Sequence, residues 1–247
     1  MADLPLITVV TVCHNNADVI EATIRSVVGQ QYPRLHYIVW DGGSTDGTPD
    51  VVRQYEEHMA FWTSERSEGT YYAMNHAAGK AVELAGSEAG HWLFFLYAGD
   101  LFAGPTVLSK VFSDPKIDHH SLKMIGGGVL RKKISGDGLR LEAAKPVAVI
   151  PSEPAFGVSS SFIRADVCCF DLDYPLAADY ALQYRLYDED GPASIAIVDE
   201  VIIITQEEDR DARLLNQRVI RGEYLGVRSR HISWQWVKEY FRWRFLG

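Results

Sequence analysis

The sequence predicts an α/β fold in which helices flank a mostly parallel sheet. Short apolar runs, rich in β-branched residues, alternate with segments of helical spacing over the first hundred residues. These runs end at loops rich in Gly, Asn, Asp and Ser, which are typical turn residues. Nearly half of the 247 residues (47%) are apolar, which is enough for a sizeable core. Alternating strands and helices of this kind predict right-handed βαβ units.

The elements of the first half follow in order. A fully apolar run at residues 6–12 is typical of a buried parallel strand, and Asn15 or Asp18 can cap the helix that follows. The further strands are predicted at residues 37–40, 61–63 and 91–96, and the helices at residues 19–28, 51–59 and 71–84.

The second half has a different pattern, which predicts antiparallel or mixed pairing. The pattern predicts two strands, at residues 124–130 and 139–150, joined by a hairpin turn at residues 135–138. A helix at 175–187, a strand at 194–205 and helices at 210–227 and 231–245 complete the chain. We expect one domain over residues 1–227, with halves 1–104 and 105–227, and an appended helix at 228–247.

Composition excludes several function classes. A formal charge of −9 argues against nucleic-acid binding, because the overall field repels phosphates. The cysteines Cys13, Cys168 and Cys169 lack metal-ligand spacing, and they predict a reducing, cytoplasmic compartment. We see no signal peptide and no apolar run long enough to span a membrane.

The loop after the second predicted strand is the most informative segment. The apolar run 37–40 ends at the carboxylate of Asp41, and a Gly- and Ser-rich loop follows. Ligands of open α/β sheets bind at the carboxyl ends of strands, where a carboxylate can accept hydrogen bonds from a base or a ribose. The alternative is a strand, a turn and a helix cap without a ligand.

An ordered series of such segments resembles the family-2 glycosyltransferases of the GT-A fold, especially the small bacterial enzymes of surface-polysaccharide assembly. The series runs over the first hundred residues. It consists of Thr8-Val9-Val10-Thr11-Val12-Cys13-His14-Asn15-Asn16, the segment 26–33, Ile38-Val39-Trp40-Asp41-Gly42-Gly43-Ser44-Thr45-Asp46-Gly47-Thr48, Ser64-Glu65, Gly69, Tyr71, Ala73-Met74-Asn75 and Phe95-Leu96-Tyr97-Ala98-Gly99-Asp100. Beyond residue 105 the likeness rests mainly on Ala177-Ala178-Asp179-Tyr180.

The resemblance implies a nucleotide-sugar donor, a UDP-sugar in our interpretation, and an inverting transfer to a hydroxyl of a glycan or a polyprenyl-linked glycan. Asp179 would be the base that deprotonates this hydroxyl, and Asp100 would lie near the diphosphate and a divalent metal, Mg²⁺ or Mn²⁺. The nucleotide would be bound by Thr11, Cys13, Asn15, Asp41 and Glu65. Residues 1–104 would then form the nucleotide-sugar half and residues 105–227 the acceptor half.

The chain departs from the family pattern in ways that bear on this prediction. Tyr97-Ala98-Gly99 stand where the family carries an Asp-x-Asp metal motif, so Asp100 is the acidic residue left there. One carboxylate is compatible with Mg²⁺, which takes one or two carboxylates together with substrate phosphates. Ser67 and Tyr72 replace frequent aspartates, and residues 158–162 replace a His-Gln pair on the acceptor side.

The C-terminal segment 228–247 is basic and aromatic in an otherwise acidic protein. It carries five Lys and Arg residues against one Glu, with three Trp among its aromatic residues. Such a helix suits an anionic membrane surface, which predicts a peripheral protein on the inner face of the membrane, held by residues 231–247. The alternative is a helix that packs on the domain or on a second copy in a homodimer.

Two other functions are alternatives to the transferase. The incomplete metal motif favours a non-catalytic nucleotide-sugar-binding or scaffold protein on the same fold. A nucleotidyltransferase would need a Gly-rich, basic loop after the first strand, and Cys13-His14-Asn15-Asn16 is neither.

Overall fold

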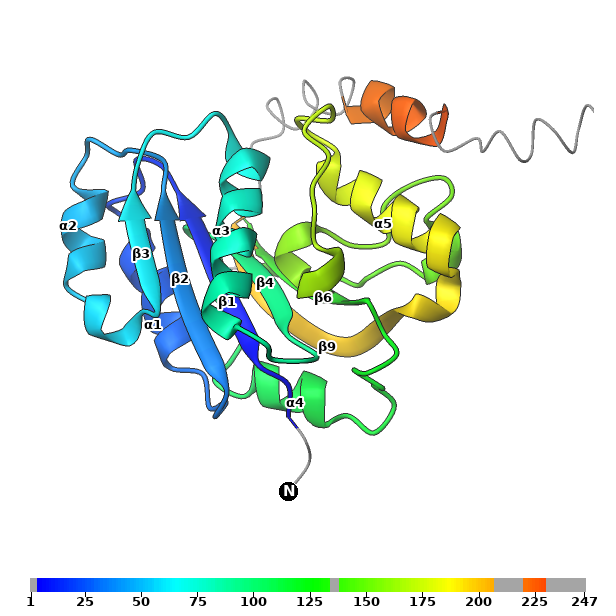
Figure 1. Ribbon diagram of the computed structural model, residues 1–247, viewed down its shortest axis with the longest axis horizontal. Helices are drawn as coiled ribbons and strands as arrows, with labels where there is room; N and C mark the ends of the chain where they lie inside the picture. Colours follow the sequence, from blue (N-terminus) through cyan, green and yellow to red (C-terminus); the bar gives the residue numbers. More distant parts are fainter. Residues whose placement is uncertain (1–3, 134–137, 207–219, 230–247) are drawn as a thin grey trace, which may run out of the picture.

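The computed structural model describes residues 4–133, 138–206 and 220–229. Over these residues, one sheet of nine strands has the order β3-β2-β1-β4-β8-β6-β9-β5, and β7 pairs with β6. The strands β3, β2, β1 and β4 can be followed side by side in Figure 1. The sheet therefore passes from the first half of the chain into the second without a break. The α/β fold class predicted from the sequence is confirmed.

The first half supplies parallel strands. They are β1 (Ile7–Cys13), β2 (Leu35–Asp41), β3 (Phe61–Ser64) and β4 (Trp92–Tyr97). The register places Cys13 beside Asp41, and Val12 beside Tyr97. Because the strands are parallel, their carboxyl ends meet at one edge of the sheet.

The second half adds mixed pairing. Its strands are β5 (Leu101–Phe102), β6 (Met124–Lys132), β7 (Leu139–Glu142), β8 (Ser161–Arg164) and β9 (Ile195–Gln206). The strand β8 runs antiparallel to β4 and to β6, whereas β6 and β9 are parallel. The direction of the sheet thus changes next to β4.

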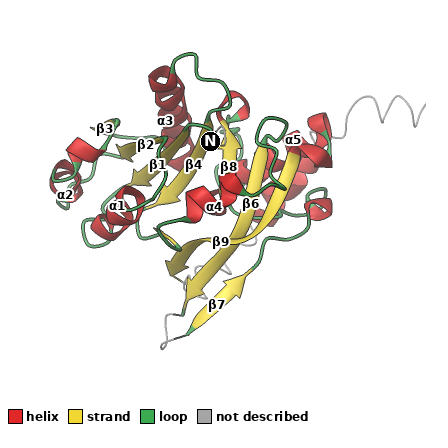
Figure 2. Cartoon of the chain, turned by 90° about the horizontal axis from the view of Figure 1, so that it is seen from below, coloured by secondary structure: helices red, strands yellow, loops and turns green. Residues whose placement is uncertain are grey.

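Helices cover both faces of the sheet (Figure 2). The helices are α1 (Ile20–Val28), α2 (Thr48–Arg53), α3 (Thr70–Ala85), α4 (Val107–Ser113) and α5 (Ala178–Asp190). One core cluster joins α3 and α5 to one face of the strands, and a second joins α1, α2 and α4 to the other. Because both faces of the central strands are buried, their sequences are continuous apolar runs.

Some element boundaries differ from the prediction. The strand expected at 139–150 ends at Glu142, and a 3₁₀ turn, Val147–Val149, follows Pro146, which lacks the N–H that a ladder needs. The helix expected at 51–59 is α2 followed by a 3₁₀ turn, Glu56–His58. The elements α4, β5 and β8 were not predicted.

Three predicted features lie wholly or partly outside the described residues. They are most of the hairpin turn at 135–138, residues 210–219 of the next helix, and the helix at 231–245. Residues 220–229 are helical as expected. Among the helices that the structure describes, none is both long and apolar enough to cross a membrane.

Two glycines give a matched test of the packing. A Cβ added to Gly126 in β6 would lie 2.1 Å from the ring of Phe156, whereas one added to Gly79 in α3 would meet nothing within 4 Å. We expect Gly126→Ala to lower the free energy of unfolding by about 1–3 kcal/mol, because an overpacked core must shift. Gly79→Ala should raise it by about 0.5–1 kcal/mol, because Ala favours the helix. Urea unfolding measures both, and a Gly126→Ala protein as stable as the parent would contradict the packing of β6.

Candidate functional site

A cavity of about 530 Å³ opens at the carboxyl ends of β1, β2 and β4, and we call it the first cavity. The strand ends contribute Val12, Cys13, Trp40 and Tyr97, and the segment before α3 contributes Arg66. Its volume is in the range of small-molecule and cofactor sites. It lies where an open α/β sheet binds ligands.

Two loops that border the first cavity are joined by hydrogen bonds. The backbone N–H of Asn15 donates to Oγ of Ser44 at 2.7 Å, and its side-chain oxygen accepts from the N–H of Thr45 at 2.9 Å. Asp46 accepts from the N–H of Ala17 at 3.0 Å and from Oγ1 of Thr48 at 2.6 Å. Asp46 is thus the structural turn residue that its position in the loop suggests.

Asp41 lies beneath the first cavity and does not line it. Its side chain is fully buried. One carboxylate oxygen accepts from Oγ of Ser64 at 2.5 Å and from the N–H of Ser44 at 2.9 Å, while the other accepts from Oγ of Ser44. In this arrangement Asp41 anchors the glycine-rich loop, and a direct contact with a nucleotide stays a prediction.

The other residues predicted to bind the nucleotide fall into two groups: Cys13 lines the first cavity, and the rest do not. Cys13 lines the first cavity, and burial, followed by the charge of Asp41, raises the pKa of its thiol. Thr11 is fully buried, with its hydroxyl 3.0 Å from that of Tyr37. Glu65 is exposed, and its N–H donates to the carbonyl of Asp41 at 3.0 Å. Thr11, Asn15 and Glu65 do not line the first cavity, and their contact with a nucleotide stays a prediction.

A second cavity of about 560 Å³ adjoins the first. Tyr97, at the end of β4, lines both cavities. The second cavity contains the two carboxylates predicted for chemistry, Asp100 and Asp179, together with Arg131 and Lys145. The chain fold thus brings together residues of both halves.

Asp100 follows the turn after β4 and is 8% exposed. Burial raises its pKa to about 6, while hydrogen bonds from Thr205 and Ser159 and the charge of Arg131 favour its ionised form. At neutral pH the carboxylate is therefore mostly ionised. It faces the second cavity, not the first.

Asp100 is the one acidic residue left at the position of the family's metal motif, and the charge of Arg131 acts on it. Among the described residues, no group of three or more His, Cys, Asp and Glu side chains could hold a metal ion. Asp100 offers one anionic oxygen ligand, and Mg²⁺ in particular is commonly bound by one or two carboxylates with substrate phosphates and water. A bound ion would neutralise charge on a diphosphate.

Asp179 lies in the first turn of α5. Its Oδ1 accepts from the hydroxyl of Tyr71 at 3.1 Å and from the N–H of Tyr180 at 2.8 Å. Burial raises the pKa of this carboxyl, and these hydrogen bonds, with one from the backbone of Val158, oppose the rise. A partly buried carboxylate at the wall of a cavity is suited to accept a proton.

The wall of the second cavity is fixed by buried polar contacts from α5. The side chain of Gln183 accepts from the N–H of Ala155 at 3.0 Å and donates to the carbonyl of Phe156 at 2.9 Å. The hydroxyl of Tyr180 donates to the carbonyl of Ile150 at 3.0 Å. These contacts hold the irregular segment that follows β7 where a sequence pattern predicted a strand.

Several cavity residues were not predicted from the sequence. Trp40, Gly42 and Ser67 line the first cavity, and Tyr97 lines both. Trp40 and Tyr97 are the last or next-to-last residues of strands whose ends were recognised as the ligand edge, and this position is the signal that could have identified them.

Comparison with known proteins places this chain in a family. Residues 8–96 match the model of glycosyl transferase family 2. An uncharacterized glycosyltransferase of Mycobacterium tuberculosis is 30% identical over 188 residues, which cover 72% of this chain and 68% of that protein. A putative teichuronic acid biosynthesis glycosyltransferase, TuaG of Bacillus subtilis, is 37% identical over 97 residues, or 39% of this chain and 36% of that one.

Solved glycosyltransferase structures share the fold at low identity. Glucosyl-3-phosphoglycerate synthase of Mycobacterium tuberculosis, solved with Mn²⁺, UDP and glucosyl-3-phosphoglycerate, has a TM-score of 0.64 at 16% identity. That match covers 91% of this chain and 80% of the other. TarS 1-349 of S. aureus with UDP-GlcNAc has a TM-score of 0.60 at 16% identity, over 83% of this chain and 59% of that one. The GT-A fold and the sequence match together show that this chain belongs to glycosyl transferase family 2.

Proposed function

We propose that this glycosyltransferase moves a sugar from a UDP-sugar, with inversion, to a hydroxyl of a glycan or lipid-linked glycan in surface-polysaccharide assembly. The observation that carries the proposal is that two cavities meet at Tyr97, with the carboxylate of Asp179 in the second. In this proposal residues 1–104 bind the donor and residues 105–227 bind the acceptor.

The first cavity is the proposed donor site. Its volume of about 530 Å³ suits a nucleotide-sized ligand, and the indole of Trp40 and the guanidinium of Arg66 offer an apolar surface and a cation. An exposed Arg at the rim can pair with a diphosphate. The choice of UDP is supported by the fold neighbours that were solved with UDP or UDP-GlcNAc.

The chemistry requires a base opposite the leaving group. Asp179 would take the proton of the acceptor hydroxyl while the hydroxyl oxygen forms a bond to the anomeric carbon. The bond from that carbon to the diphosphate oxygen would break, and UDP would leave with the bonding electrons. Attack from the face opposite the diphosphate inverts the anomeric centre.

The departing diphosphate needs charge stabilisation. Asp100 would hold a divalent ion with the diphosphate if one binds, and Arg66 lies at the first cavity to supply positive charge. Two fold neighbours were solved with Mn²⁺ and a nucleotide or nucleotide sugar, which supports testing that metal first.

The nature of the acceptor is supported by relatives. TuaG is named for teichuronic acid biosynthesis, and mycobacterial relatives at 29% identity are named for PGL/p-HBAD biosynthesis. The basic, aromatic sequence at 231–247, which lies outside the described residues, would keep the protein peripheral on an anionic membrane. That location would suit a lipid-linked acceptor, and a homodimer stays a prediction.

Donor and metal are tested together by thermal shift. We expect UDP-sugars to raise the melting temperature more than GDP- or dTDP-sugars, and Mn²⁺ to increase this rise. In Asp100→Asn, the UDP-sugar should still raise the melting temperature, but Mn²⁺ should no longer increase this rise. Asp199→Asn, which removes an exposed carboxylate on β9, is the matched control and should keep both. A parent protein that responds to UDP-sugars equally with Mn²⁺ and with EDTA would contradict the metal role of Asp100.

The base is tested by substitution without a change of shape. Asp179→Asn should lower the release of UDP from a UDP-sugar, with water in place of the acceptor, by about 10²–10⁴-fold, because general-base help is lost. UDP binding measured by calorimetry should persist. The control Glu189→Gln removes an exposed carboxylate of the same helix and should leave the rate unchanged. Unchanged turnover in Asp179→Asn would favour a non-catalytic nucleotide-sugar-binding protein or another base.

A further inference from the structure

The carboxylate of Asp179 is faced by tyrosines from separate elements. Tyr71 comes from α3, Tyr97 from β4, and Tyr224 from the helical segment 220–229. The charge of Asp179 contributes to raising the pKa of all three hydroxyls, after the larger effect of burial. The hydroxyl of Tyr71 hydrogen-bonds the carboxylate, at 3.1 Å.

The ring of Tyr71 is held in place by its neighbours. It packs against the ring of Phe170, with the centroids 5.2 Å apart. The backbone of Phe170 is in turn held by the side chain of Asn75, which donates to its carbonyl and accepts from its N–H, both at 2.9 Å. Since Asn75 lies one helical turn after Tyr71 in α3, the same helix presents the hydroxyl and fixes the surface behind it.

Tyr71 directly follows residues that line the first cavity. It is the second residue of α3, and the residues just before it, Arg66, Ser67, Gly69 and Thr70, line that cavity. One short segment, residues 66–71, therefore both lines the proposed donor site and contacts the proposed base, which lies 108 residues after Tyr71 in the chain.

We propose that Tyr71 is a positioning residue whose hydroxyl holds the carboxylate of Asp179 in the orientation that accepts the proton of the acceptor. This inference rests on the proposed function, because it assigns a partner to the proposed base. The hydroxyl of Tyr71 is suited to this role because burial keeps it protonated and hence a donor.

The hydrogen bond has an electrostatic consequence. Burial raises the pKa of Asp179, and the donors Tyr71, Tyr180 and Val158 lower it. Without the Tyr71 hydroxyl, fewer hydrogen bonds counter the effect of burial on the pKa of Asp179. This pKa should therefore rise further, and the base should ionise only at higher pH. The substitution leaves the other groups that face Asp179 or share its cavity in place; they are Tyr97, Tyr224, Asp100, Arg131, Glu142 and Lys145.

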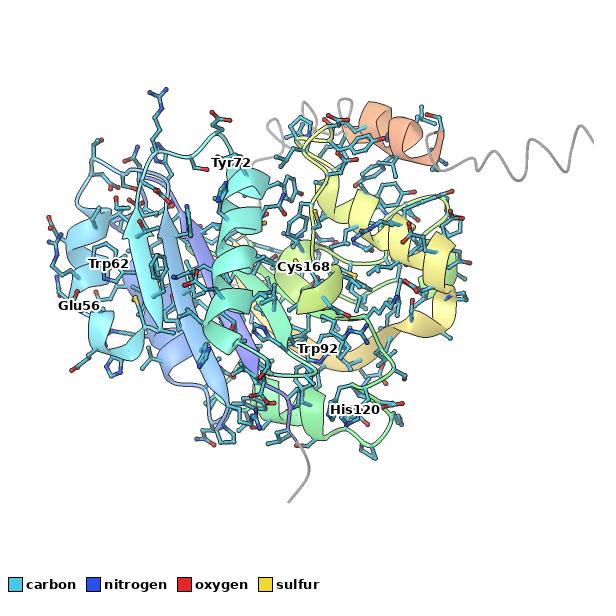
Figure 3. All side chains as sticks on the ribbon, in the orientation of Figure 1. Glu56, Trp62, Tyr72, Trp92, His120 and Cys168 are labelled. Carbon is cyan, nitrogen blue, oxygen red and sulfur yellow. The ribbon has the colours of Figure 1, made fainter. Side chains whose placement is uncertain are left out.

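The test compares Tyr71→Phe with Tyr72→Phe. Tyr72 lies beside Tyr71 at the same end of α3, with its ring 4.4 Å from that of His76, and it keeps its packing in the control (Figure 3). A pH titration followed by carbon-13 NMR, with the Asp carboxyl carbons labelled, gives the titration midpoint of Asp179. The signal of Asp179 is assigned as the one that is missing in Asp179→Asn. This measurement needs no acceptor.

We expect Tyr71→Phe to raise that midpoint by about one pH unit, from the strength of a hydrogen bond to a charged group. In the pH profile of the rate of UDP release, the acidic limb should move to higher pH by the same amount. The rate at low pH should therefore fall about tenfold. The KM for the UDP-sugar should stay unchanged, and Tyr72→Phe should match the parent. Far-UV circular dichroism and UDP calorimetry establish that each variant is folded.

A midpoint in Tyr71→Phe equal to that of the parent would overturn the inference, as would an equal rise in Tyr72→Phe. Failure of the proposed function has a different signature. In that case Asp179→Asn retains turnover, whatever the midpoint in Tyr71→Phe.

Discussion

The buried hydroxyl of Thr23 holds the turn on which both cavities depend. It accepts from the N–H of Gly99 at 2.9 Å and donates to the carbonyl of Asp100 at 3.0 Å. Gly99 has φ of +97°, a conformation that L side chains rarely adopt, so the turn needs glycine there. This turn ends β4 and fixes where Tyr97 and Asp100 face. Helix α1, which carries Thr23 and lines neither cavity, thereby determines the boundary between the two cavities.

The change of strand direction beside β4 explains why the two cavities are adjacent. The parallel strands on one side align their carboxyl ends and leave the first cavity above them. On the other side, β8 runs antiparallel to β4 and to β6, so that the irregular segments around β6 and α5 close the second cavity. A donor bound at one side and an acceptor at the other would meet near Tyr97. Two buried or partly buried carboxylates there, Asp100 and Asp179, have different partners, and this difference supports different roles.

The local features of the fold could be predicted from the sequence, and the long-range pairings could not. The apolar runs of β1 and β4 and the loop after Asp41 are visible in short windows, because burial on both faces leaves a continuous apolar pattern. The strand β8, at four residues, is too short to show a period, and Val147–Val149 was mistaken for strand because its composition is apolar. The contact of Asp41 with a nucleotide stays a prediction, whereas its hydrogen bond from Ser64, 23 residues away, could not be predicted from the sequence. The bond between Tyr71 and Asp179 spans 108 residues and leaves no trace in any local pattern.

In the proposed mechanism, Asp179 activates the acceptor from the face opposite the leaving diphosphate. Proton NMR of the sugar first released from an α-linked UDP-sugar, with water as acceptor, tests it most directly, before the anomers interconvert. We predict that the β-anomer forms first. Initial release of the α-anomer would contradict it, because the configuration would then be retained and a base at Asp179 would not describe the reaction.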